Sequence, residues 1–495
     1  MLYYQILDKH EAELPAIIFH EERLSYGQLR DKVQSWAAFL QEQGLKRGER
    51  VGLFSKNCAN FVVAYFAIIK AGGIVVPFNY QLAMPEVAYI VKDASISKMI
   101  VAAPLPLEEA LADSGYPGTL HQYVFADLDA GKKEAYREPS LTENDCCTII
   151  YTSGTTGKPK GAMLSHRNLL TNAEDFTKVV TMRKGYKCLC VLPMYHCFAW
   201  TTSVTGSLFT GECIIVQDNY TLGQAVDLID KYQINDFFGV PTMMQMFLDD
   251  APVERLKSLQ FFISGGAPLP HKLGKDFLAK FGKPVQEGYG LSEAAPVVTV
   301  NPPTKIKAGS IGPAIPNVLT EIRNKEDQPV KTGVVGELCV QGPNVMLGYL
   351  NNPEATAKTL RGGWLHTGDM AYKDEEGFIF LVDRLKDMII AAGENVYPRE
   401  IEEILYQHPA VKEVAVIGVP DKLRGQAVAA YVVLKPGAVA TKPELRKFLR
   451  GKLANYKLPK YFMFLEQMPK TQTGKILKKA LRERSIADLV GPIGK

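Results

Sequence analysis

The sequence lacks the features expected of membrane, secreted and metal-binding proteins. Its longest apolar run, residues 61–69, ends at Lys70 and is too short to span a bilayer. No basic, apolar and small-residue signal pattern opens the chain, and no peroxisomal tripeptide closes it. The eight cysteines are scattered without the spacing of metal ligands, so free thiols in a reducing compartment are expected. These absences predict a cytoplasmic protein with at most peripheral membrane contact.

Charge is nearly balanced overall but unevenly distributed. The net charge is +4, yet residues 386–495 hold 20 Lys and Arg against 11 Asp and Glu, while the rest holds 37 against 42. An acidic body with a basic C-terminal piece indicates two units that jointly hold an anionic ligand, although a solvated basic surface is the alternative. No nucleic-acid-binding motif accompanies the charge, so a nucleic-acid partner is not expected.

The chain is long enough for more than one domain. At 495 residues, with 46% hydrophobic and 22% charged residues, it has the composition of a globular protein with at least two cores. Helix-like and strand-like segments alternate over 24–100 and again over 188–265, which predicts parallel α/β layers. Short strands and Gly/Pro turns at about 305–384 predict a small β subdomain. We therefore expect an α/β N-terminal domain, 1–385, and a mobile α+β C-terminal domain, 386–495.

The block YTSGTTGKPKG at 151–161 is the most informative stretch. Glycines let the backbone approach a ligand closely, and amides, hydroxyls and ammonium groups suit a polyphosphate. It is not the common P-loop, because Pro159 follows Lys158 and the glycine spacing differs. A flexible surface turn is the alternative. The predicted phosphate-binding residues are Thr152, Ser153, Gly154, Thr155, Thr156, Gly157, Lys158 and Lys160.

Six further blocks accompany this loop in a fixed order. They are SGGAP (264–268), EGYGLSEAAP (287–296), GELCVQGPNVMLGY (336–349), WLHTGD (364–369), DRLKDMIIAAGENVYPREIE (383–402) and PKTQTGK (469–475). With them the chain resembles the adenylate-forming (AMP-binding) superfamily of acyl-CoA synthetases, aryl-CoA ligases, luciferases and peptide-synthetase adenylation domains. It is most similar to bacterial medium- and long-chain fatty acyl-CoA synthetases. The resemblance implies ATP, Mg²⁺ and CoA as reaction partners, with an acyl-adenylate formed first and a thioester second.

The resemblance also implies roles for individual residues around the nucleotide. Glu293 matches the glutamate that holds Mg²⁺, a hard cation that prefers oxygen ligands. Asp369 and Arg384 match the residues that hold the ribose, and Tyr289 is placed to stack on adenine. Without the surrounding blocks, Glu293 would be read as a solvated glutamate, Asp369 as a turn cap and Tyr289 as a core tyrosine. Further nucleotide contacts are implied for Gly265, Gly266, Ala267, Gly288, Gly290 and Ser292.

The C-terminal blocks imply the moving parts of the reaction. Lys475 matches the catalytic lysine, whose ammonium bridges the attacking carboxylate and the α-phosphate. Lys386, two residues after Arg384, matches the hinge about which the C-terminal domain turns for the second step. Ala392 and Gly393 would then line the tunnel for the pantetheine arm of CoA.

The acid substrate is the least determined feature. His196 matches a catalytic histidine near the substrate carboxylate, and Trp200 falls where some relatives place an aromatic gate, although core packing is an equal alternative for Trp200. Gly239 and Met243 are predicted to line the same acyl pocket. An unbranched medium- or long-chain fatty acid is the preferred substrate. An aryl-acid CoA ligase, an acyl-AMP ligase without CoA transfer and a silent binding protein are alternatives, and a homodimer stays possible.

Overall fold

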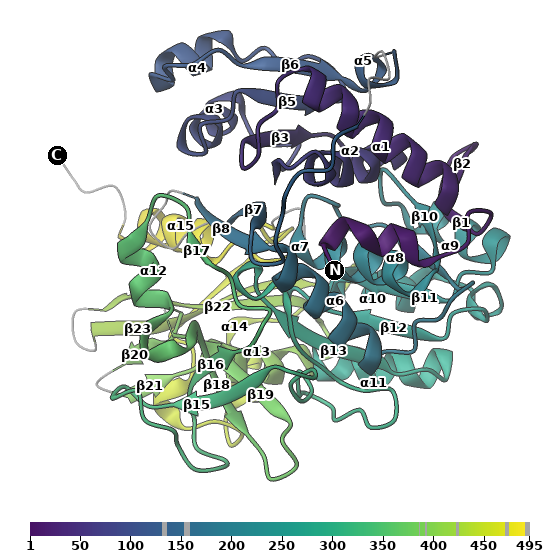
Figure 1. The fold of residues 1–495 in the computed structure, drawn as a ribbon. Coiled ribbons are helices and arrows are strands. Elements are labelled where there is room, and N and C mark those ends of the chain that lie inside the picture. The colour runs from purple at the N-terminus through teal and green to yellow at the C-terminus, as the bar shows by residue number, and fades with distance from the viewer. Residues whose placement is uncertain are drawn as a thin grey trace.

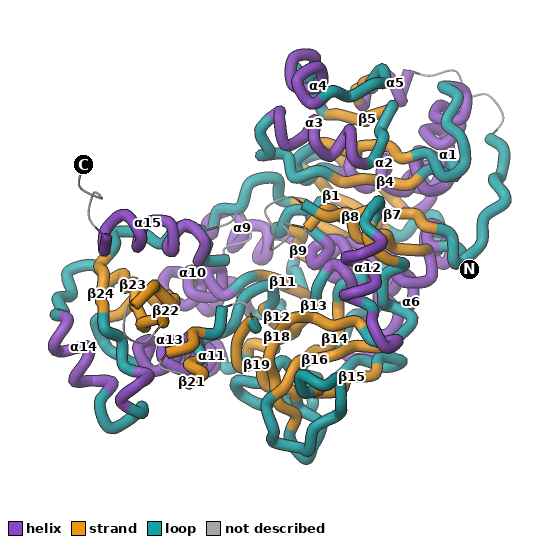
Figure 2. The backbone as a smooth tube through the Cα atoms, turned by 90° about the vertical axis from the view of Figure 1, so that its left-hand side faces the viewer, coloured by secondary structure: helices purple, strands orange, loops and turns teal. Residues whose placement is uncertain are grey.

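The structure is a computed structural model, and most of the chain is described in it. The described residues are 1–130, 136–152, 159–385, 387–391, 394–421, 425–470 and 475–490. They form four β-sheets with helices packed between and around them (Figure 1). In Figure 2 the elements of the last sheet gather at one end of the molecule, beside the three earlier sheets.

A seven-stranded, mostly parallel sheet forms from six strands of the first third of the chain and one strand from much later in the sequence. Its order is β17–β8–β7–β4–β3–β5–β6, with bounds Gly348–Tyr349, Lys160–Ser165, Cys146–Thr152, Ile74–Pro77, Arg50–Phe54, Lys98–Val101 and His121–Val124. The helices of this region are α1 (Tyr26–Glu42), α2 (Ala59–Lys70), α3 (Met84–Asp93), α4 (Glu108–Ser114) and α5 (Phe125–Ala130). Helix α2 is apolar on nearly every face because it contacts α1 and strands of both large sheets.

An eight-stranded sheet supplies the second layer. Its order is β14–β13–β12–β11–β9–β10–β1–β2, with bounds Val297–Val300, Val285–Gly290, Phe261–Ser264, Asp236–Gly239, Lys187–Cys190, Cys213–Val216, Pro15–Phe19 and Glu22–Ser25. Strands β13 through β1 in this order run parallel, so their carboxyl ends meet along one edge. The associated helices are α6 (His166–Val179), α7 (Cys197–Ala199), the π-helical η2 (Trp200–Thr205), α8 (Gly206–Thr210), α9 (Leu222–Tyr232), α10 (Pro241–Asp250) and α11 (His271–Phe281).

A four-stranded antiparallel sheet lies within the predicted β-rich stretch 305–384. Its order is β15–β16–β18–β19, with bounds Leu319–Arg323, Gly336–Gln341, Leu365–Lys373 and Ile379–Arg384. The same stretch also sends β17 to the seven-stranded sheet and contributes α12 (Pro353–Thr359). Short 3₁₀ helices are η1 (Tyr3–Lys9), η3 (Val253–Leu256), η4 (Ser292–Ala294), η5 (Arg361–Gly363) and η6 (Asn455–Lys457).

The C-terminal sheet has its own hydrophobic core. Its strands are β21 (Glu394–Val396), β20 (Ile389–Ala391), β23 (Gly425–Leu434), β22 (Val411–Asp421) and β24 (Tyr461–Phe464), and within the described residues they pair only with one another. Helices α13 (Pro398–Tyr406), α14 (Lys442–Leu449) and α15 (Lys478–Val490) accompany them. A separate core is what an independent folding unit requires. The predicted boundary residue, Lys386, lies outside the described residues, so the division at 385/386 stays a prediction.

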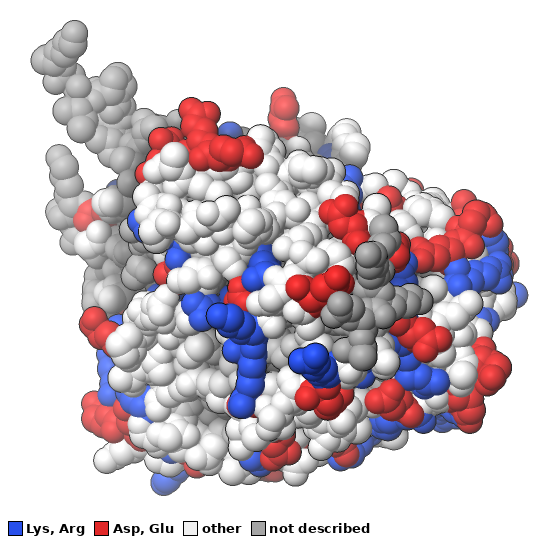
Figure 3. Space-filling model, turned by 45° about the horizontal axis from the view of Figure 1, so that its top comes forward, with Lys and Arg blue, Asp and Glu red and all other residues white. Residues whose placement is uncertain are grey.

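The surface carries both signs of charge. On the face shown in Figure 3, acidic and basic side chains are interspersed, and some of the basic ones gather near the centre of the view. In the part of the chain that the structure describes, no helix combines the length and the apolar character that a membrane crossing requires.

Two carboxyl groups are buried together at the start of β10 and β11. Glu212 accepts hydrogen bonds from the Ser207 hydroxyl at 2.9 Å and from the Arg183 amide at 2.9 Å. Asp236 interacts with Glu212, and among the described residues neither of its oxygens has another hydrogen-bond partner. Burial and the neighbouring carboxyl raise the pKa of Asp236 well above its usual value, and burial raises that of Glu212. The pair therefore keeps a proton where exposed carboxyls are ionised.

The Asp236→Asn variant tests this shared proton through the pH dependence of stability. A carboxyl whose pKa is raised by folding stabilises the fold at low pH, and this contribution is lost as the pH rises through the folded pKa. An amide does not titrate, so the melting temperature of the variant relative to the parent should rise by about 2 °C or more between pH 5 and pH 9. The control is Asp250→Asn, at the exposed end of α10. A constant difference between the two pH values would contradict the shared proton.

Candidate active site

A cavity of about 1420 Å³ opens at the carboxyl ends of the parallel strands of the eight-stranded sheet. Its walls also include residues of the seven-stranded and four-stranded sheets, and Lys475 reaches it from the C-terminal part of the chain. Such an edge is where ligands bind in open α/β sheets. The predicted site residues that line it are Thr152, Lys160, His196, Gly265, Gly266, Gly288, Tyr289, Gly290, Ser292, Glu293, Asp369, Arg384 and Lys475.

Four predicted site residues do not line this cavity. Trp200 is fully buried, its ring stacks on Tyr65 with 3.7 Å between centroids, and its indole N–H donates to the Tyr3 hydroxyl at 2.9 Å. The structure thus places Trp200 in the core between α2 and η1, the alternative that the sequence left open. Ala267, Gly239 and Met243 are likewise not among the residues that line the cavity. The residues Ser153, Gly154, Thr155, Thr156, Gly157, Lys158, Lys386, Ala392 and Gly393 lie outside the described residues.

A buried carboxylate organises one side of the cavity. Asp369 is 6% exposed, accepts a hydrogen bond from the Tyr289 hydroxyl at 2.5 Å and pairs with the Arg384 guanidinium at 3.1 Å. Asp369 and Arg384 face each other in the β18–β19 ladder, while Tyr289 comes from β13. Burial and the Asp369 charge raise the pKa of the Tyr289 phenol well above its usual value, so it remains a donor. The arrangement offers a fixed acceptor for the hydroxyls of a sugar.

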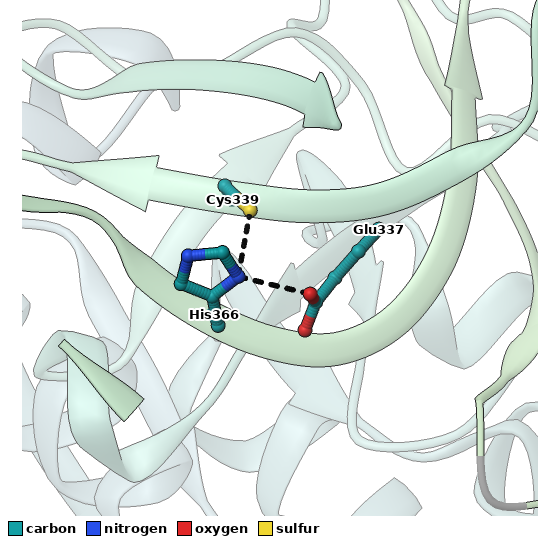
Figure 4. A group of neighbouring side chains, drawn as sticks. All are labelled: Glu337, Cys339 and His366. Atoms are coloured by element: carbon teal, nitrogen blue, oxygen red, sulfur yellow. Dashed lines mark hydrogen bonds and ion pairs between the residues drawn. The ribbon is translucent and has the colours of Figure 1, made fainter. Parts of the chain in front are cut away.

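Glu337 positions the turn that carries Asp369. Its Oε1 accepts from the Gly368 amide at 2.9 Å, and its Oε2 lies 2.9 Å from His366 Nδ1 (Figure 4). A carboxylate only accepts, so the proton of a neutral His366 is on Nδ1. The Thr367 hydroxyl continues the turn by donating to the Leu338 carbonyl at 2.7 Å and accepting from the Asp369 amide at 3.1 Å. These bonds fix the backbone just before Asp369.

Glu337, Cys339 and His366 also have the composition of a metal site. Their ligand atoms lie within 4.8 Å of one another, and Cys339 Sγ is 3.4 Å from His366 Nδ1 (Figure 4). However, the Arg361 guanidinium donates to Glu337 at 3.2 Å, so a cation already neutralises the carboxylate. In the absence of a metal ion, burial raises the pKa of the Cys339 thiol to about 12, so the thiol takes part in the hydrogen-bonded cluster in its protonated form. The cluster therefore serves as a hydrogen-bonded support for the turn.

Glu293 also lines the cavity. It sits in the short helix η4, and its Oε1 accepts from the Tyr349 hydroxyl at 2.7 Å. Lys160 lies over the Tyr349 ring, with 5.2 Å between Nζ and the centroid. The neighbouring Ser292 hydroxyl contacts the Cys197 thiol at 3.2 Å. A carboxylate, two hydroxyls and an ammonium group at one wall are suited to a phosphate chain with a hard cation such as Mg²⁺.

His196 and Lys475 complete the reactive side. His196 caps α7, where its Nδ1 accepts from the Phe198 amide at 3.2 Å, so the neutral ring carries its proton on Nε2. Burial and the Lys475 ammonium lower the pKa of His196 to about 4. The histidine is therefore a neutral donor at physiological pH, and Lys475 supplies the positive charge there.

Two glycines are required for the shape of the cavity. A Cβ atom on Gly265 would lie 2.9 Å from the Phe198 ring, and one on Gly290 would lie 2.0 Å from the Pro296 carbonyl oxygen. A side chain at either position would force the wall to move. A Cβ atom on Gly266 would lie 3.8 Å from Lys475 Cε, so the loop after β12 passes directly beside the lysine.

Several contributors were not singled out from the sequence. Tyr349 and Glu337 belong to the block 336–349, and Thr367 to the block 364–369, but the resemblance implies no individual role for them. Their membership of motif blocks was the available signal. Cys197 follows His196 directly, and nothing in the sequence points to its contact with Ser292.

Comparison with known proteins agrees with this geometry. A family model described as AMP-binding enzyme matches residues 5–350. The chain belongs to the AMP-binding enzyme family. A second model, AMP-binding enzyme C-terminal domain, matches residues 400–475. The long-chain-fatty-acid–CoA ligase of Bacillus subtilis (strain 168) is 38% identical over 97% of this chain and 93% of its own. A feruloyl-CoA synthase of an Amycolatopsis species is 37% identical over 93% and 94%.

A solved structure of similar fold supports the same assignment. ATP-bound MatB from Rhodopseudomonas palustris has a TM-score of 0.93 at 31% identity, over 99% of this AMP-binding enzyme and 100% of that chain. The apo form of the same protein has a TM-score of 0.83 at 30% identity, over 99% and 100%. The predicted α/β fold with a separate C-terminal α+β part is confirmed.

The Tyr289→Phe variant tests the organisation around Asp369. Without the phenol, Arg384 is the one side-chain partner that the buried carboxylate keeps among the described residues, so its orientation is lost. Hydrogen bonds to charged groups contribute about 1.5–3 kcal/mol, so ATP should bind about tenfold or more weakly, as measured by calorimetry. Tyr372→Phe is a control that removes a phenol from the strand of Asp369, because Tyr372 lies on β18 but stacks on Phe380 and does not line the cavity. Unchanged ATP affinity in Tyr289→Phe would contradict this organisation.

Proposed function

We propose that this AMP-binding enzyme is a fatty acid–CoA ligase. It uses ATP to convert an unbranched medium- or long-chain fatty acid into an acyl-adenylate, and then transfers the acyl group to CoA. The observation that carries the proposal is the meeting of Glu293, Asp369 and Lys475 in one cavity, although they come from three separate parts of the chain.

The nucleotide would bind between the two acidic residues. Asp369, oriented by Tyr289 and Arg384, would accept the ribose hydroxyls. Thr152, Ser292 and Lys160 would face the phosphates, and Glu293 would hold Mg²⁺. The fit of Glu293 to this cation rests on its carboxylate at the cavity wall, oriented through one oxygen by Tyr349. When bound, the ion neutralises charge on the phosphate oxygens.

The first step joins two anions, which is its main difficulty. A carboxylate oxygen of the acid attacks the α-phosphorus, and the bond to pyrophosphate breaks. Lys475 would place its ammonium between the attacking carboxylate and the α-phosphate, where negative charge develops. Neutral His196 would donate from Nε2 to orient the acid. In the second step the CoA sulfur attacks the acyl carbon, the bond from this carbon to the phosphate oxygen breaks, and AMP leaves while the thiol proton is released to water.

The acid would lie against an apolar wall. Four residues from three elements pack in one cluster and also line the cavity: Phe176 on α6, Ile263 on β12, and Val297 and Val300 on β14. Phe198 packs against them. A wall of this kind stabilises an alkyl chain by burial from water and offers no partner to an α-amino group.

An aryl-acid CoA ligase is the second candidate. It is favoured by the 37% identical feruloyl-CoA synthase and by the aromatic rings of Phe176 and Phe198 at the cavity, which could stack on a flat acid. The hinge at Lys386 and the CoA contacts of Ala392 and Gly393 belong to this proposal in either case. Cytoplasmic location and a homodimer are further parts of the proposal that await measurement.

A panel of acids tests the proposed substrate. Saturated acids from C4 to C18 are compared with ferulate, coumarate and benzoate, measuring pyrophosphate release and acyl-CoA formation. The highest kcat/KM is expected for a fatty acid of medium or long chain. Preference for the aromatic acids would overturn that assignment, and acyl-AMP formation without thioester would favour a ligase that does not use CoA. No AMP from any acid would contradict the proposed function.

Lys475→Ala tests the role of the ammonium. Removal of one preorganised charge typically costs about 10²–10³ in kcat, so pyrophosphate release should fall by that factor. Thioester formation from supplied acyl-adenylate should change little, because the lysine acts only in the first step. Lys479→Ala is the control, since Lys479 is 79% exposed on α15. Equal loss in both half-reactions would contradict the assigned role.

A further inference from the structure

Arg399 joins the C-terminal part of the chain to the rest of the molecule. It is the second residue of α13, it is 9% exposed, and its contacts lie mainly outside the C-terminal sheet. Its Nη1 donates to the Leu381 carbonyl at 3.1 Å, and its backbone amide donates to the Asp383 carboxylate at 2.9 Å. Both partners lie on β19, the last strand before the predicted hinge. Arg399 is therefore held between two parts of the chain.

The guanidinium of Arg399 also lies between two carboxylates. Nη2 is 3.9 Å from Glu287 of β13, and Nε is 3.9 Å from Glu403, one turn further along α13. Glu287 is 5% exposed, and burial raises its pKa to about 7 while the charge of Arg399 opposes that shift. A buried carboxylate is costly without a cation, so Glu287 favours the arrangement in which Arg399 is docked.

Both carboxylates bind the same loop, which leads back to the cavity. Glu287 accepts from the Leu269 amide at 3.1 Å, and Glu403 accepts from the His271 amide at 3.3 Å at the N-terminus of α11. The loop starts after β12 with Gly265 and Gly266, and Gly266 lies beside Lys475. One end of this loop therefore contacts the docked helix α13, and the other end contacts Lys475.

We propose that Arg399 is a positioning residue, which docks the C-terminal part through Glu287, Leu381 and Asp383 so that Lys475 stays in the cavity. This inference rests on the proposed function, because it requires a reaction of two steps. Lys475 is needed in the first step, adenylation, and not in the second, thioester formation. Arg399 must leave Glu287 when the C-terminal part turns for transfer to CoA. The residue therefore acts on adenylation through Lys475 and not on the thioester step.

The half-reactions of Arg399→Met test this assignment. The methionine keeps an unbranched apolar stem but removes the charge and the bond to Leu381. Adenylation, followed by pyrophosphate release, should slow about tenfold, with kcat affected more than the KM for ATP or acid. Thioester formation from supplied acyl-adenylate should be unchanged or faster. Arg446→Met is the matched control, since Arg446 is exposed on α14. Equal loss in both half-reactions, or no loss in adenylation, would overturn the assignment.

A double-mutant comparison tests whether Arg399 acts through Glu287. Glu287→Gln keeps an acceptor for the Leu269 amide and removes only the charge, so adenylation should slow about threefold. The variant with both substitutions should be no slower than Arg399→Met alone, because the shared interaction is already lost. If the rate loss in the double variant were the product of the two single losses, the residues would act independently, and that result would contradict the docking pair.

Hydrogen exchange gives a readout that needs no activity. In Arg399→Met, amides of the peptide around Leu269 and His271 should exchange about tenfold faster, since Glu287 and Glu403 lose the cation that orients them. Peptides of α14 should keep their rates. Unchanged exchange at this loop would overturn the docking role even if the enzyme is active. Failure of the parent to form AMP from any acid would instead contradict the proposed function, while the exchange result would stand.

Discussion

The buried carboxylate of Asp369 is the interaction on which the rest of the site depends. A charge with so little exposure is stable only when it is fully partnered, and its two side-chain partners come from different sheets. The Tyr289 phenol ties it to the eight-stranded sheet, and the Arg384 guanidinium ties it to the end of β19. The carboxylate therefore fixes the small sheet against the large one and sets where the chain leaves for the C-terminal part.

Much of the fold and the centre of the site could be predicted from the sequence. The alternation of helix-like and strand-like segments is a local pattern of the sequence, and this alternation predicts the parallel α/β layers. The residues Glu293, Asp369 and Lys475 each lie in a motif block, and the resemblance predicted that they act together although the chain separates them widely. In the structure all three residues line the same cavity. Motif residues are predictable in this way because each role depends partly on the local backbone shape, which the neighbouring residues of the block specify.

The partners of those residues could not be predicted, because a side-chain contact between distant segments leaves no pattern in one sequence. Tyr349 meets Glu293 across 56 residues, and the Glu337 carboxylate meets the Gly368 amide across 31. Trp200 illustrates the same limit on the apolar side. Its position after His196 suggested a place at the pocket, but the π-helical turn directs its ring onto Tyr65 in the core. Sequence spacing does not determine which face of such a turn is directed to a cavity.

The strength of the contacts between the two parts of the chain is consistent with the proposed two-step reaction. A lysine that acts in one step and leaves before the next must be placed by contacts that are specific but reversible. Charge-assisted bonds at 2.7–2.9 Å are the strong ones, whereas Arg399 lies 3.9 Å from both Glu287 and Glu403. Its shorter bonds go to β19, which immediately precedes the predicted hinge. The docking contacts thus combine short bonds to β19 with longer charge pairing to Glu287 and Glu403, and contacts of this mixed strength would suit the rotation that the proposed reaction requires.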